Sequence, residues 1–321
     1  MESAISEIVT FEPNLKIMEK VIELNQISEY NAANNHTTLH PLVSVIDFSK
    51  ADLRDWGQSV TRVKFQYGLY CIYLKDVKCG DIVYGRHTYD YQAGTLVFFA
   101  PGQVSELEVP AEPYQPKGHG LIFHPDLIHG TDLAKALPLY HFFSYKSNEA
   151  LHISDAERQV VLDCLSKIEF ELNQTVDKHS KKLITANIEL FLNYCERFYD
   201  RQFISREHVN QGILAKFEEL LNMYFLSEKP QNLGLPSVAY FADQLHLSPN
   251  YFGDLIKKET GKSVKEMIQN KLIDVAKERI FDGAKSINEI AHDLGFKYPQ
   301  HFTRVFKQHV GNTPLQFRHL N

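Results

Sequence analysis

Alternating apolar and polar positions mark the first half of the chain as rich in β-strands. Between about Leu42 and Tyr145, short β-branched and aromatic runs are separated by turns such as Pro101-Gly102. From Val63 to Tyr73 every second residue is apolar, the period of a strand with one buried face. Closely spaced strands predict a small antiparallel barrel or jelly roll over residues 41–150, preceded by an extension, residues 1–40, to which no function is assigned.

After Ser154 the apolar spacing becomes helical. Val161, Leu165, Ile168 and Leu172 are separated by four, three and four residues, and a second series repeats this spacing within the helical segment 151–205. Two interpretations stay open, packing on the chain's own barrel or contact with a second copy, and the narrow stripe favours a homodimer. The residues expected to mediate it are Ile184, Ile188, Phe191 and Phe198.

A short unit occurs twice in the last third of the chain. Ser237, Ala242 and Leu245 recur 49 residues later, and Phe252 and Gly261 recur 50 residues later. Capping residues and glycine stops predict two helices joined by a tight turn in each copy. This is the helix-turn-helix layout, over about residues 237–261 and 286–311.

The segment between the copies, residues 264–281, is uninterrupted by Gly or Pro. As a helix it would span about 27 Å, so it could hold two recognition helices in successive major-groove segments about 34 Å apart. Arg, Gln and Asn can read base edges, whereas Lys and Thr suit phosphates. The predicted DNA-contacting residues are Asn250, Tyr251, Gly253, Asp254, Lys257, Gln300, His301, Thr303, Arg304 and Lys307.

Composition adds little that is specific to DNA. The 321 residues suggest about two domains, and 44% hydrophobic and 23% charged residues are ordinary for globular proteins. From Ile213 to Asn321 there are 14 Lys and Arg against 12 Asp and Glu, whereas the net charge overall is −6. The four dispersed cysteines, and the lack of a long apolar run or a leader pattern, lead us to expect a cytoplasmic protein without membrane spans.

At these motifs the sequence resembles the AraC family of bacterial transcription regulators. The resemblance covers Ile213 to Leu320 and includes Leu247-Ser248-Pro249-x-Tyr251-Phe252, Ile290-Ala291-x-x-Leu294-Gly295-Phe296 and Phe302-x-Arg304-x-Phe306-Lys307. It implies a DNA-binding domain over residues 213–321 in which both recognition helices enter the major groove. The family's base-reading positions fall on Asn250, Gly253, Asp254, Gln300, His301 and Arg304.

Asp254 departs from what a DNA-reading position favours. A carboxylate accepts only from cytosine N4 and is repelled by phosphate. The second helix-turn-helix, with Gln300 and Arg304, is therefore expected to carry much of the sequence specificity.

The N-terminal half resembles, more weakly, the cupin-type effector domain found in many AraC proteins. Cupin metal sites use a His-x-His pair and a later His, but His87-Thr88-Tyr89 lacks the second imidazole and Val104-Ser105-Glu106 stands at the later position. No bound metal or cofactor is expected, and a cupin metalloenzyme remains the alternative function. Aromatic and polar residues suit a small-molecule pocket instead, namely Arg62, Lys64, Tyr67, Tyr84, Arg86, His87 and Phe98.

The sequence thus predicts an α+β protein, with a cupin-like barrel and flanking helices followed by an all-α domain with two helix-turn-helix units. The expected function is that of a dimeric, non-enzymatic transcription regulator that binds double-stranded DNA under the control of a small-molecule effector. RNA polymerase is a further candidate partner. A barrel that serves only as an oligomerisation module is the third interpretation.

Overall fold

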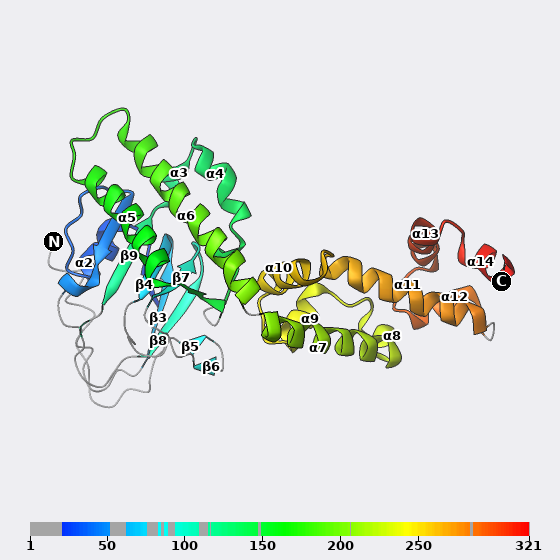
Figure 1. Ribbon diagram of the computed structural model, residues 1–321. Helices are drawn as coiled ribbons and strands as arrows, with labels where there is room; N and C mark the ends of the chain where they lie inside the picture. Colours follow the sequence, from blue (N-terminus) through cyan, green and yellow to red (C-terminus); the bar gives the residue numbers. More distant parts are fainter. Residues whose placement is uncertain are drawn as a thin grey trace. The chain divides into compact units, whose positions relative to one another are not determined.

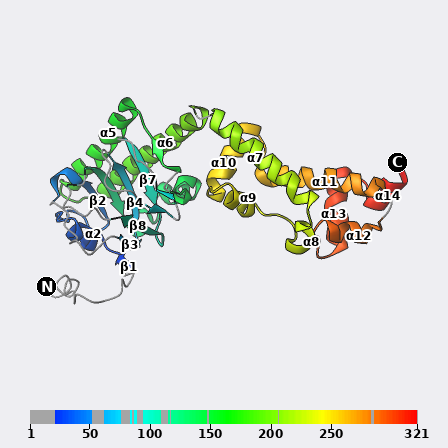
Figure 2. The ribbon, with the colours of Figure 1, turned by 90° about the horizontal axis from the view of Figure 1, so that it is seen from below.

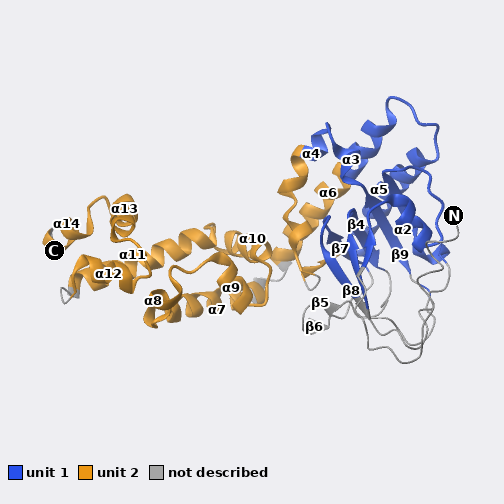
Figure 3. Cartoon of the chain, turned by 180° about the vertical axis from the view of Figure 1, so that it is seen from behind, with its two compact units in different colours: residues 1–134, 154–188 blue, residues 135–153, 189–321 orange. Residues whose placement is uncertain are grey.

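The computed structural model describes residues 21–51, 62–75, 83–84, 87–88, 94–108, 115, 117–146, 149–205, 207–282 and 285–320. Strands dominate the N-terminal half and helices the C-terminal half, so the expected α+β class is confirmed (Figure 1). The chain separates into two compact units (Figure 3). We call them the sheet unit, residues 1–134 and 154–188, and the helical unit, residues 135–153 and 189–321.

The sheet unit contains two main sheets. The smaller has the order β1-β3-β8, with β1 parallel to β3 and β8 antiparallel to it. In the larger, β7, β4, β9 and β2 lie side by side and pair antiparallel. The strands are β1 Val21–Leu24, β2 Val43–Asp47, β3 Arg62–Tyr67, β4 Tyr70–Lys75, β7 Thr95–Phe99, β8 Val104–Glu108 and β9 Gly118–Phe123, with a separate hairpin of β5 Val83–Tyr84 and β6 His87–Thr88.

Aromatic side chains join the two sheets. The ring centroid of Tyr67 on β3 lies 5.7 Å from that of Phe99 on β7, which in turn lies 5.8 Å from Tyr73 on β4. Among the described strands the two sheets share no hydrogen-bonded neighbours, so these strands form two packed sheets and the predicted cupin-like barrel is not confirmed. Alternation of apolar residues requires only one buried face per strand, and packed sheets satisfy it as well as a barrel does.

Residues 21–33 belong to this fold, although the sequence assigned them to an extension. Strand β1 pairs with β3, and helix α2, Ile27–Ala33, buries Ile27 completely and Tyr30 almost so. Helix α5, Asp155–Leu172, starts at a capping box formed by Ser154 and Glu157. It runs along the larger sheet, against β2, and buries Val161, Leu165 and Ile168 (Figures 1 and 2).

The four side chains predicted to form a dimer contact are core residues of a single chain. Ile184 and Ile188 are 1% and 0% exposed in the sheet unit, and Phe191 and Phe198 are 1% and 7% exposed in the helical unit. All four lie on α6, Ser180–Ser205. The narrow stripe therefore packs inside the chain, which corrects the expectation that these side chains face a second copy.

The helical unit contains the predicted double helix-turn-helix. Its helices are α7 Glu207–Leu226, α8 Lys229–Leu233, α9 Val238–Gln244, α10 Pro249–Thr260, α11 Val264–Asp282, α12 Ile287–Asp293, α13 Pro299–Val310 and α14 Pro314–Leu320. Phe217 on α7 packs on Phe241 and Phe252 of the first helix-turn-helix, with ring centroids 5.2 and 5.1 Å away. Phe302 and Phe306 form the equivalent core of the second.

Short elements complete the described structure. In or beside the sheet unit these are η1 Phe48–Lys50, α3 Pro125–Ile128 and α4 Asp132–Ala136. Helices η2 Leu137–Leu139 and η3 His141–Ser144 and strand β10 Leu151–His152 belong to the helical unit. Residues 135–153 thus pack with the helix-turn-helix units, although the sequence pattern placed most of them in the sheet domain.

Candidate nucleic-acid interface

Matched turns hold the two helices of each copy at the same geometry. The amide of Leu247 donates to the carbonyl of Ala242 at 2.9 Å, and the amide of Phe296 donates to that of Ala291 at 2.9 Å. The intervening residues, His246 and Gly295, have φ of 59° and 89°. The repeat seen in the sequence is therefore a repeat of backbone conformation.

Caps fix where the two candidate recognition helices begin and end. Helix α10 starts after Ser248, whose hydroxyl accepts from the amide of Tyr251, and Pro249 fills its first turn. Helix α13 starts at Pro299. Gly261 and Gly311 end the two helices with left-handed φ of 71° and 88°. These are the starts and stops that the sequence predicted.

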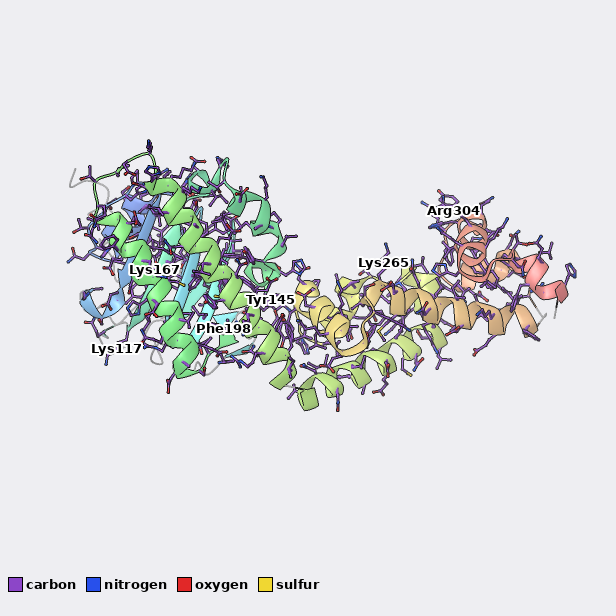
Figure 4. The ribbon with its side chains drawn as sticks, turned by 45° about the horizontal axis from the view of Figure 1, so that its top comes forward. Lys117, Tyr145, Lys167, Phe198, Lys265 and Arg304 are labelled. Atoms are coloured by element: carbon purple, nitrogen blue, oxygen red, sulfur yellow. The ribbon has the colours of Figure 1, made fainter. Side chains whose placement is uncertain are left out.

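Helix α13 presents a polar face. Phe302 and Phe306 are fully buried, while the opposite side carries exposed Gln300, His301, Arg304 and Lys307. Figure 4 shows Arg304 at the outer edge of this helix. Thr303 is half-buried and lines a hollow with Ser286, Asn288 and Thr313. An exposed Arg and Gln one helical turn apart can reach base edges in a major groove.

Helix α10 differs from α13 in what surrounds its polar residues. Asn250 and Lys257 are exposed, and Gly253 and Asp254 are half-buried. Tyr251 is only 5% exposed, with its ring centroid 5.2 Å from Tyr145 and 5.1 Å from Phe203. Tyr251 is thus a packing residue of the helical unit, which the sequence had assigned to DNA contact.

Asp254 is bonded to residues far away in the sequence. The hydroxyl of Tyr145 donates to Oδ2 of Asp254 at 2.6 Å, and Nδ1 of His141 lies 3.0 Å from the same oxygen. Figure 4 shows Tyr145 beside α10. Burial, together with the Asp254 carboxylate, raises the pKa of Tyr145, so the phenol stays protonated as a donor. Sequence reasoning flagged Asp254 as unusual but missed Tyr145 and His141, since no local spacing connects them.

The first turn of α10 is bonded to the same region. The side-chain amide of Asn250 donates to Oγ of Ser144 at 2.7 Å. The carboxylate of Glu149, 2% exposed, accepts from the amide and the hydroxyl of Ser248, each at 2.6 Å. We call residues 141–146 and 149 the η3 segment. This segment bonds to the N-cap of α10, Ser248, and to Asn250 and Asp254 within the helix.

The connector between the two copies is one continuous helix. Helix α11 buries Val264, Ile268, Leu272 and Ile280 along its length. At its C-terminal end the guanidinium of Arg279 donates to the carbonyls of Asp293 and Phe225, at 3.1 and 2.9 Å. These bonds tie α11 to both α12 and α7, as a rigid spacer requires.

The predicted effector pocket is only partly within the described residues. Lys64 is half-buried, and Tyr67 and Phe98 are 7% and 5% exposed. The side chains of Arg62, Tyr84, Arg86 and His87 lie outside the described residues. Where side chains are described, no three His, Cys, Asp or Glu residues come together as metal ligands. The described helices include none with the length and apolarity needed to cross a membrane.

Comparison with known proteins agrees with the helix-turn-helix geometry. A family described as a helix-turn-helix domain matches residues 241–319. YfiF of Bacillus subtilis, an uncharacterized HTH-type transcriptional regulator, is 33% identical over 141 residues, which are 44% of this chain and 41% of YfiF. AdaA of the same organism, a bifunctional transcriptional activator and DNA repair enzyme, is 29% identical over 107 residues, 33% of this chain and 49% of AdaA. This chain thus spans less than half of either relative.

The chain is also similar to solved structures. The C-terminal domain of AraT, a response regulator from Geobacillus stearothermophilus, is 24% identical, with a TM-score of 0.31, over 34% of this chain and 85% of that one. ToxT from Vibrio cholerae is 14% identical, with a TM-score of 0.27, over 86% of this chain and 97% of that one. Residues 241–319 thus form a helix-turn-helix domain similar to those of HTH-type transcriptional regulators, in agreement with the AraC-type resemblance of the sequence.

Proposed function

We propose that the chain is a sequence-specific regulator of transcription in which α13 does most of the base reading. The observation that carries this is the contrast between the two candidate recognition helices. Gln300, Arg304 and Lys307 are exposed on α13, whereas Asp254 on α10 is already bonded to Tyr145 and His141. Arg and Gln can bind guanine and adenine through paired hydrogen bonds, while Lys neutralises phosphate.

Binding of the full chain to duplex DNA at two ionic strengths tests this proposal. Each phosphate contact releases counterions, so affinity should fall steeply with salt. Lys307→Ala should reduce the slope of log affinity against log salt by about 1. The matched control is Lys216→Ala, since Lys216 is exposed on α7 and does not belong to a recognition helix. Binding that ignores salt, or equal effects of the two substitutions, would contradict the assignment.

Homodimerisation belongs to the same proposal, because paired half-sites are the expected operator form. Exposed apolar side chains support a contact around the turn between α5 and α6: Phe170 is 63%, Val176 69% and Leu183 44% exposed. They are not the residues expected from the sequence, which are buried. A dimer contact formed by these three exposed side chains would not disturb the core of the sheet unit.

Effector control is the remaining part of the proposal. Polar groups lie among the rings between the two sheets: the hydroxyl of Tyr30 donates to that of Tyr73 at 2.8 Å, and Ser105 Oγ donates to the Tyr67 hydroxyl at 3.3 Å. Rings with a few hydroxyls suit a small, largely apolar molecule carrying one polar group. RNA polymerase stays a candidate partner of the DNA-bound regulator.

A further inference from the structure

The first helix-turn-helix is covered where it would meet DNA. A recognition helix reads bases with its N-terminal residues, and on α10 these include Asn250 and Asp254. Asn250 is bonded to Ser144 at 2.7 Å, and Asp254 is bonded to Tyr145 at 2.6 Å. Both partners belong to the η3 segment, and all these residues lie in the helical unit.

The major groove of DNA cannot accommodate both α10 and the η3 segment. The groove of B-DNA is about 12 Å wide and about 8.5 Å deep. A helix with its side chains is about 10 to 12 Å across and fills that space. The η3 segment lies on the side of α10 that carries Asn250 and Asp254, so it cannot enter the groove with them. DNA and the η3 segment therefore exclude each other on this surface.

The contacts between the η3 segment and α10 include buried polar groups and packed aromatic rings. Glu149 is 2% exposed and binds the amide and hydroxyl of Ser248, the residue that caps α10. The ring of Tyr145 lies edge-on to Tyr199 and Tyr251, with centroids 5.3 and 5.2 Å away. The segment is also held from behind, because the hydroxyl of Tyr199 donates to the carbonyl of Glu149 at 3.2 Å.

We propose that the η3 segment is an intramolecular latch, for which Asn250 and Asp254 are docking residues, and that it must leave α10 before the first helix-turn-helix binds DNA. In the latched chain only the second helix-turn-helix is free to occupy a groove. When the η3 segment leaves α10, the first helix-turn-helix can also bind, one helical turn of DNA away. This inference rests on the proposed function, since it concerns the regulation of the same DNA-reading surface.

The contact with the η3 segment explains why position 254 carries a carboxylate. A carboxylate on a base-reading helix is repelled by phosphate, which makes it a poor choice for affinity. As the acceptor for Tyr145 and His141, the same carboxylate forms charge-assisted hydrogen bonds, which are stronger than neutral ones. At the matching position of the repeat, 50 residues later, α13 carries Arg304, which is exposed.

The test uses the full-length chain and a duplex that the wild-type chain selects from a randomised library. Tyr145→Phe removes only the hydroxyl that donates to Asp254. A hydrogen bond to a charged group contributes enough that its loss should shift the latch about tenfold toward release. Apparent affinity scales with the fraction of binding-competent chains, so Tyr145→Phe should bind the duplex up to about tenfold more tightly. Its hydroxyl-radical footprint should extend to a second groove segment about 10 base pairs away.

Tyr140→Phe is the matched control. It removes a hydroxyl bond of similar length, 2.7 Å, from the same region, but the acceptor is Asn193 on α6 and not α10. Its affinity and footprint should equal those of the wild type. Ser144→Ala provides a second, exposed position that releases Asn250, so the test does not depend on the folding of one variant. Ser144→Ala should also raise affinity and lengthen the footprint.

The outcomes separate the latch from the proposed function. If the wild type binds with the expected salt dependence but Tyr145→Phe and Ser144→Ala match it in affinity and footprint, the latch is wrong and the regulator assignment stands. If Tyr140→Phe tightens binding as much as Tyr145→Phe, the effect is not a contact with α10, and the latch is again wrong. If no variant binds any duplex, the proposed function itself fails.

Discussion

The buried carboxylate of Glu149 accepts two hydrogen bonds from Ser248, one from its amide and one from its hydroxyl, each 2.6 Å long. Burial raises the pKa of Glu149, although the bonds from Ser248 and from the amide of Lys146 act in the opposite direction. These two bonds join the η3 segment to the cap of α10, so the protonation state of Glu149 affects the stability of the helical unit.

The first prediction concerns the pH dependence of that stability. A folded-state pKa above the unfolded value means that the folded chain binds the proton more tightly. The contribution of Glu149 to the free energy of unfolding is therefore fully present below the ordinary glutamate value of 4.5 and is lost as pH rises through the raised pKa. Relative to Glu149→Gln, which does not titrate, the wild type should gain stability as pH falls from 7 toward this range. Urea denaturation at several pH values measures this difference, and parallel curves for the two proteins would contradict it.

The second prediction compares two glycines of the second helix-turn-helix that share a positive φ. A Cβ on Gly295 would lie 2.7 Å from the carbonyl carbon of Gly234 and 2.7 Å from the carbonyl oxygen of Pro230, whereas nothing lies within 4 Å of one on Gly311. Gly311→Ala should therefore cost only the conformational strain, about 1 kcal/mol. Gly295→Ala adds an overlap with backbone and should cost about 3 kcal/mol or more. Thermal unfolding of the two variants decides this, and equal losses would rule out the close approach.

The third prediction separates base reading from phosphate binding on α13. Arg304→Ala should reduce the preference for the selected duplex over random DNA by about 1 to 3 kcal/mol. Lys307→Ala should weaken both duplexes equally, because a phosphate contact carries no sequence information. Competition binding with the two duplexes measures the ratio. A full preference retained by Arg304→Ala would show that α13 is not the reading helix.

The sequence predicted the DNA-binding domain well because its features are local and repeated. Capping residues, glycine stops and the recurrence of Phe252 as Phe302 act within one or two helical turns, and the structure places both helices between the expected residues. The glycine at position 295, where the first copy has His246, has a basis beyond local pattern, because the backbone that approaches Gly295 belongs to Pro230 and Gly234.

Contacts between residues far apart in the sequence could not be predicted from it. His141 and Tyr145 meet Asp254 across 113 and 109 residues, and no periodicity reports such a pairing. The spacing of Ile184 and Ile188 fits a helix that packs within one chain as well as a helix between two chains, so the pattern could not decide between them. Strand alternation likewise identified β4 and β7 but could not distinguish a barrel from the two packed sheets that the described strands form.

The last prediction locates the dimer contact by comparing a buried with an exposed apolar residue. Ile188 is 0% exposed, so Ile188→Glu would bury an unpaired charge, which typically costs about 3 to 5 kcal/mol. We expect this variant to lose folded structure, detected as a loss of cooperative unfolding by circular dichroism. Phe170, at 63% exposure, can accept a charge without that cost. Phe170→Glu should therefore stay folded and become monomeric by light scattering. A folded monomer from Ile188→Glu would restore the buried stripe as the dimer contact, and a dimeric Phe170→Glu would exclude the turn between α5 and α6.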